Sequence, residues 1–132
     1  MVDTSETFML DKPSSQRFLD EALLTEIRSI GTELFPRMQT IRRQMHAHPE
    51  LSMRELETTK YLEEQLRRVG FEPRGTIRDV GLTCDWESEN ASEETPRVGI
   101  RADIDALPIQ TCSSVAYVSQ VPGAMHACGH DA

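Results

Sequence analysis

The chain has 132 residues, a size at which one domain can bury a hydrophobic core. Its formal net charge of −8 argues against a nucleic-acid partner, because affinity for phosphates depends on clustered lysine and arginine. No apolar run is long enough to span a membrane, and the acidic N-terminus lacks the features of a secretory signal. Three cysteines without such a signal fit a reducing compartment, so we expect a cytoplasmic protein with neither nucleic acid nor membrane as a partner.

The N-terminal third combines a polar leader with a long periodic stretch. Residues 1–15 are polar and are expected to form a flexible leader. Gly31 and Pro36 interrupt the stretch that follows, and a residue before proline is disfavoured in helical angles, so we expect two helices with a break between Gly31 and Phe35. Apolar residues recur every three or four positions over residues 16–46, which predicts a buried helix face made of Leu19, Leu23, Ile27, Ile30, Leu34, Met38, Ile41 and Met45.

A further helix is predicted over residues 53–69. Pro49 ends the preceding helix. Ser52 followed by Glu55 matches a capping box, in which each side chain bonds a backbone N–H at the helix start. Gly70 stands where a left-handed residue would close the helix.

The pattern then changes to short strand-like segments. Residues 71–77, 81–88 and 97–104 are rich in β-branched or aromatic residues and are bounded by glycine and proline. The acidic loop "ENASEETP" predicts a hairpin between the second and third segments. Val98 and Ile100 alternate in the third, which predicts an inner strand. Helices followed by strands indicate a mixed α/β layer.

The sequence "RADIDALP" places Asp103 and Asp105 at the end of the third predicted strand. In an extended chain both carboxylates point to one face. They could bind a cation, orient a histidine or cap the next turn. From Asp103 to Asp131 regular patterning fades, and prolines stiffen the chain. We therefore expect an ordered loop that forms a site.

The sequence "HACGHD" holds the densest group of metal-binding side chains. Cys128 and His130 flank Gly129, so a thiolate and an imidazole can reach one metal or one member of a metal pair. Zn²⁺, or a similar cation such as Co²⁺, Ni²⁺ or Mn²⁺, suits these donors. Asp131 could support a ligating ring or cap a following helix. His126 is interpreted as a structural histidine.

Two ligands do not complete a site, because zinc takes about three or four. His46 and His48 could supply more if "HAHPE" folds back, or further ligands could follow in a longer protein. Cys84 lies in a predicted strand and is expected in the core, and Cys112 is a weak candidate. A thiol redox role for Cys128 is disfavoured, because no second thiol stands at C-x-x-C spacing.

Three ordered motifs, "IRRQMHAHPELSMRELETTKYLEEQLRRVGFE", "VGIRADIDALPIQ" and "PGAMHACGHDA", resemble the M20 metallopeptidase family. The chain is most similar to its amidohydrolase branch, which includes hippurate hydrolases, N-acyl-amino-acid amidohydrolases and plant auxin-conjugate hydrolases. The resemblance runs from Ile41 to Ala132 and breaks only at the acidic loop 88–96. It implies a zinc-aminopeptidase-like α/β catalytic domain. Residues 16–132 would be its N-terminal portion, without the rest of the domain or the lid and dimerisation domain.

The resemblance also implies a function. Members use a divalent metal pair, often Zn²⁺ or Mn²⁺, to hydrolyse the amide bond of small N-acyl amino acid substrates. Cys128 and His130 would be metal ligands. Asp105 would contact a metal-ligating side chain and support it without binding the metal itself. Asp103 stands where other branches place a ligating histidine, and it would line the site with Asp131 and His126.

The chain departs from the family pattern at two places. The general-base glutamate of the family lies beyond "CGHD", outside these 132 residues, so we expect the chain alone to be inactive and its parent, which could be a homodimer, to be the enzyme. Thr111 and Cys112 stand where the family more often has acidic residues. A non-catalytic metal-binding or interaction fragment is the alternative.

Overall fold

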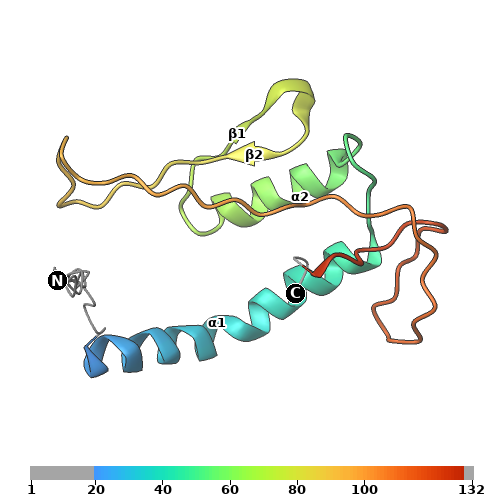
Figure 1. The fold of residues 1–132 in the computed structure, drawn as a ribbon, viewed down its shortest axis with the longest axis horizontal. Helices are drawn as coiled ribbons and strands as arrows, with labels where there is room; N and C mark the ends of the chain where they lie inside the picture. The colour runs from blue at the N-terminus through green and yellow to red at the C-terminus, as the bar shows by residue number, and fades with distance from the viewer. Residues whose placement is uncertain (1–19, 130–132) are drawn as a thin grey trace, which may run out of the picture. The chain divides into compact units, whose positions relative to one another are not determined.

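The computed structural model describes residues 20–129, apart from the side chain of Ile77 (Figure 1). The elements follow as α1 (Glu21–Ala47), α2 (Leu56–Arg67), β1 (Arg74–Gly75), a 3-10 turn η1 (Ile77–Asp79) and β2 (Leu82–Thr83). The chain divides after Pro36 into two compact units, which are considered separately. The expected leader, residues 1–15, lies outside the described residues.

Helix α1 is one helix, so the predicted break between Gly31 and Phe35 is wrong. Pro36 lies inside it. Proline removes one backbone hydrogen bond, but its fixed φ is a helical value, and here the helix continues past the missing bond. Asp20 Oδ1 caps the start by accepting from Ala22 N at 3.0 Å. The end is near Pro49, as predicted.

The apolar face of α1 is not the buried face that the periodicity predicts. In the first unit Leu23, Ile27, Ile30 and Leu34 are 43–49% exposed. The period of apolar residues predicts a helix correctly, but burial also needs a second surface on which the helix can pack. None of the described helices is long and apolar enough to cross a membrane.

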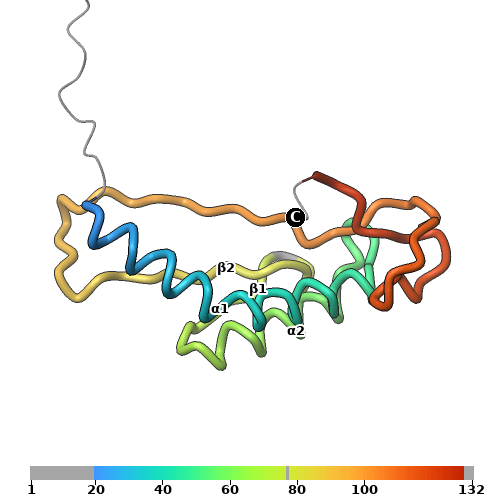
Figure 2. Tube along the Cα trace, turned by 90° about the horizontal axis from the view of Figure 1, so that it is seen from below, coloured from blue at the N-terminus to red at the C-terminus, as the bar shows by residue number. Residues whose placement is uncertain are grey.

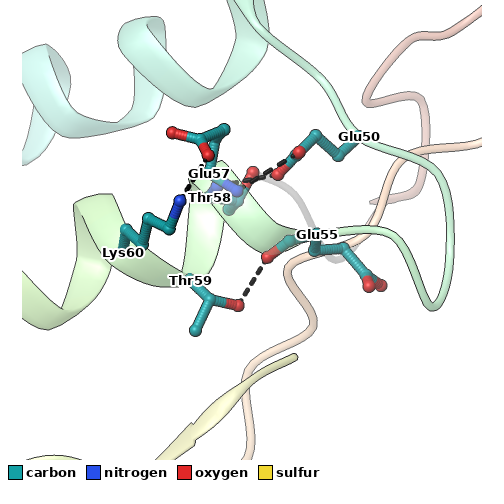
Figure 3. A network of polar contacts seen from close by, with 6 residues as sticks. All are labelled: Glu50, Glu55, Glu57, Thr58, Thr59 and Lys60. Atoms are coloured by element: carbon teal, nitrogen blue, oxygen red, sulfur yellow. Dashed lines mark hydrogen bonds and ion pairs between the residues drawn. The ribbon is translucent and has the colours of Figure 1, made fainter. Parts of the chain in front are cut away.

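Helix α2 begins three residues later than predicted, and the Ser52–Glu55 capping box does not form. Met53 has a positive φ of 65°, so Ser52 lies in a turn away from the helix start. Glu55 is the N-cap residue but makes no side-chain cap bond. The Glu50 carboxylate accepts instead from the backbone N–H groups of Glu57 at 3.2 Å and Thr58 at 2.7 Å (Figure 3). A distant carboxylate thus takes the capping role.

The predicted C-terminal cap of α2 is confirmed. Gly70 has a φ of 88°, which is unfavourable for residues with a Cβ. Its N–H bonds the Arg67 carbonyl, and the Phe71 N–H bonds the Leu66 carbonyl, both at 3.1 Å. These two bonds form a Schellman motif, which satisfies carbonyls that the helix leaves open.

The described sheet is a hairpin of the first and second predicted strands. Arg74 pairs with Thr83 and Gly75 with Leu82 in antiparallel register. The predicted hairpin across the acidic loop is therefore wrong. Residues 97–104 form no strand within the described part of the chain, and Val98 and Ile100 are 84% and 94% exposed. Side-chain alternation predicted a strand there, but a strand also needs a hydrogen-bonded neighbour.

Thr59 links α2 to the hairpin. Its side chain is buried, and Oγ1 donates to the Glu55 carbonyl at 2.5 Å. The same oxygen accepts from Gly81 N at 2.8 Å. Helix, turn and hairpin therefore share one buried hydroxyl. Helices followed by a small sheet confirm the predicted order of elements.

We predict that Thr59→Val lowers the free energy of unfolding by about 1–3 kcal/mol, because it leaves the Gly81 N–H without its acceptor. Urea unfolding followed by circular dichroism measures this. Thr32→Val is the matched control, since Thr32 makes the same bond to a helix carbonyl on an exposed surface. It should change stability by less than about 0.5 kcal/mol. Equal losses in both variants would contradict the link.

Candidate functional site

All three family-like motifs meet at a backbone junction just beyond α1. Ala106 N donates to the Glu50 carbonyl at 2.8 Å, and Leu51 and Ala106 form a parallel bridge. Leu107 and Met125 exchange two bonds, of 3.0 and 3.1 Å, in an antiparallel bridge. Figures 1 and 2 both show the deep-orange and red loops near this end of α1. The junction therefore joins "RADIDALP" to "MHACGH", although the two motifs are well separated in sequence.

The loop between these two motifs is also attached to the junction. Gln120 N also donates to the Ala47 carbonyl at 2.8 Å, which attaches the intervening loop to the end of α1. The buried residues at the junction are Ala47, Pro49, Ala106, Ala124 and His126.

The two aspartates of "RADIDALP" differ in their surroundings. Asp105 is half-buried and directly precedes Ala106 in the junction. Asp103 is exposed, and its Oδ1 lies 2.7 Å from a guanidinium nitrogen of Arg101. Such a surface ion pair contributes little to stability. Of the two predicted site residues, Asp105 is therefore the one attached to the junction.

The predicted metal ligands lie at the edge of the described chain. His126 is buried at 8% exposure, and Cys128 is exposed two residues later. His130 and Asp131 lie outside the described residues. Within residues 20–129 no three His, Cys, Asp or Glu side chains are grouped so as to hold a metal ion. The exposed Cys128 thiol is accessible, and thiolate and imidazole are donors that zinc-like cations accept. These two kinds of donor therefore suit a metal ion, but a pair of metal ions needs more ligands than these.

The possible fold-back of "HAHPE" brings in one histidine. The His46 ring lies 6.5 Å from the His126 ring, between centroids, at a tilt of 31°. The His48 ring turns back to its own helix, where Nδ1 lies 3.0 Å from the Gln44 carbonyl and donates to it. His46 therefore reaches the junction and His48 does not. Within residues 20–129 these histidines belong to no group of three side chains that could hold a metal ion. The predicted site also includes His130, which lies outside the described residues, so it stays a prediction.

Tyr117 is a junction residue that the sequence did not single out. The Arg43 guanidinium lies 5.0 Å from its ring centroid, and the His46 ring contacts it edge-on at 5.7 Å. A cation over an aromatic face is attractive. Tyr117 thereby attaches the loop before "MHACGH" to α1. One aromatic residue in an irregular loop gives no periodic signal by which to find it.

Glu57 and Lys60 form an ion pair on the surface of α2. The hydrogen bond to the Glu57 carboxylate raises the pKa of Lys60, and both side chains are largely exposed (Figure 3). Cys84 is half-buried and follows β2, so its predicted place in the core is only partly matched. Cys112 is exposed, as suits a variable loop residue.

The junction and its motifs define a class: the chain is similar to one segment of the amidohydrolases. No family model matches it. It is 44% identical over 91 residues to N-acetyl-L-cysteine deacetylase of Bacillus subtilis, covering 69% of the chain and 21% of that protein. It is 37% identical over 109 residues to hippurate hydrolase of Campylobacter jejuni, covering 83% of the chain and 27% of that enzyme.

The fold points to a particular family within that class. A dinuclear metal-binding peptidase of the M20 family from Bacillus subtilis matches with a TM-score of 0.67 and 40% identity, over 76% of this chain and 28% of its own. The resemblance to the M20 family and its amidohydrolases is thus confirmed in sequence and in fold. The chain spans between 21% and 28% of the length of these three relatives.

We predict that Tyr117→Leu lowers the free energy of unfolding by about 1 kcal/mol, because the ring contacts with Arg43 and His46 are lost. Tyr117→Phe keeps the ring and is the matched control, so it should cost less than about half of that amount. Urea unfolding of both variants measures the difference. A phenylalanine variant as unstable as the leucine variant would contradict the ring contacts.

Proposed function

We propose that the longer protein to which this chain corresponds hydrolyses the amide bond of small N-acyl amino acids with a divalent metal pair. One observation carries the proposal: the Leu107–Met125 bridge joins the segments that hold Asp105 and Cys128. A site needs both segments in one place. The sequence similarity to a deacetylase and a hippurate hydrolase supports the same class of substrate.

Each predicted residue has a role in this proposal. The Cys128 thiolate and the His130 imidazole hold metal, and Asp105 orients a ligand through a hydrogen bond. Asp103, Asp131 and His126 line the site. Residues 16–132 form the N-terminal part of the catalytic domain, after a leader at residues 1–15. We further propose a cytoplasmic and homodimeric parent.

The metal, as Zn²⁺ or Mn²⁺ with Co²⁺ or Ni²⁺ as substitutes, would polarise the amide carbonyl and acidify a water molecule. This chain contributes ligands and their orientation. The buried His126 and the bridge at Met125 fix the backbone two and three residues before Cys128, which limits where the thiol can lie. The proton transfer belongs to a glutamate of the parent outside these 132 residues.

We predict that Co²⁺ added to the chain produces a thiolate-to-cobalt charge-transfer absorption, because Cys128 is an exposed donor beside His130. Cys128→Ser should abolish the band. Cys112→Ser removes another exposed thiol and is the matched control, so it should leave the band intact. The reverse result would place the metal on Cys112 and contradict the proposal.

We also predict that the 132-residue chain does not hydrolyse hippurate or N-acetyl amino acids, because it lacks the general base. A longer protein that contains this chain and the glutamate should hydrolyse them, and Asp105→Asn in it should lower the rate by about 10- to 100-fold. Product release measured by chromatography tests both statements. Hydrolysis by the short chain, or none by the long protein, would overturn them.

An interaction fragment without catalysis is the second candidate. It is favoured by exposed apolar side chains, since Trp86, Val98 and Ile100 are 76–94% exposed. Large exposed apolar surfaces commonly mark contact sites. The hydrolysis experiment with the longer protein separates the two candidates.

A further inference from the structure

We infer that Glu50 is the positioning residue of the candidate site: it fixes the junction to the start of α2 through its side chain and to the Asp105 segment through its backbone. The side chain and the backbone of Glu50 thereby connect the junction, the start of α2 and the segment that holds Asp105. The inference rests on the proposed function only in treating this junction as part of a site. The hydrogen bonds themselves are independent of metal and substrate.

The side chain of Glu50 binds the amino end of α2. The first N–H groups of a helix have no partner within it, and they carry partial positive charge. The Glu50 carboxylate accepts from two of them, at Glu57 and Thr58 (Figure 3). The N-cap residue Glu55 supplies no such bond. Thr58 is buried, so the bond at 2.7 Å is shielded from water on one side.

The backbone of Glu50 binds the site segment. Its carbonyl accepts from Ala106 N at 2.8 Å, next to Asp105. Ala106 is 2% exposed, so a lost bond there would leave a buried N–H without a partner. The next residue, Leu107, carries the bridge to Met125. If Glu50 moves, its bond to Ala106 moves the Ala106–Leu107 backbone, and the Leu107–Met125 bridge then moves the segment that leads to Cys128.

A purely local cap would behave differently from a positioning residue. A local cap stabilises the first turn of α2 and nothing else. A positioning residue also holds the Ala106, Leu107 and Met125 amides in their bonds, because the backbone at residue 50 is kept in place by its own side chain. Amide hydrogen exchange, read residue by residue by NMR, distinguishes the two roles.

The experiment compares the 132-residue chain with Glu50→Ala, Glu50→Gln and Glu64→Gln. Glu50→Ala should lower protection about five- to tenfold at Glu57, Thr58, Ala106, Leu107 and Met125. Glu50→Gln keeps one acceptor oxygen and should restore part of it. Glu64→Gln is the matched control, since it alters an exposed, ion-paired carboxylate further along α2 and should leave all five amides unchanged. Phe71 N–H, at the far end of α2, shows whether the variant also loosens the rest of the helix.

The outcomes separate clearly. Loss at all five amides with Phe71 unchanged supports the inference. Loss confined to Glu57 and Thr58 would show a cap alone, uniform loss that includes Phe71 would show a general effect on stability, and either result would overturn the inference. Absence of protection at Ala106 in the unaltered chain would also overturn it. Because no metal or substrate is present, failure here is distinct from failure to hydrolyse N-acyl amino acids.

Discussion

The pairing of buried backbone groups beyond α1 is the constraint on which the candidate site depends. Ala106 is almost fully buried, and its N–H must find an acceptor, which is the Glu50 carbonyl. The reciprocal bonds of Leu107 and Met125 continue the same arrangement. Ala47 and Ala124 are buried in the same region. Without this packing, the acidic and the thiol-bearing motif would be two loops with no defined relation.

The two ends of α2 show what sequence can and cannot predict about a helix. Gly70 was predictable, because the left-handed conformation that ends a helix is a property of one residue. The cap at the start of α2 was not predictable, because the turn at Met53 places Ser52 away from the helix start and the Glu50 carboxylate next to it. The spacing of Ser52 and Glu55 has the right form for a capping box. A carboxylate seven residues before its amide follows no local rule and depends on the path of the chain between them.

The candidate site divides in the same way. Cys128 was predicted as a metal donor from residue types at fixed spacing, which is local information, and the role of Asp105 was implied by the family resemblance; both remain predictions. The sequence could not predict which aspartate lies at the junction, because Asp103 and Asp105 are only two residues apart and differ only in how the chain packs around them. Tyr117 and the inward placement of His46 likewise depend on how the loop folds back on α1. His130 and Asp131 remain predictions.

The apolar side chains are exposed because a periodic sequence pattern marks a face suited to burial but does not supply the second surface that would bury it. Apolar spacing in α1 and alternation at Val98 and Ile100 describe faces that are suited to burial. The helix forms regardless, because its hydrogen bonds lie within one segment. The strand at residues 97–104 does not form, because every bond of a ladder needs a second segment in register. Sequence reasoning therefore predicted that the helices exist and how α2 ends, but it was wrong about the break in α1, the start of α2 and the strand at residues 97–104.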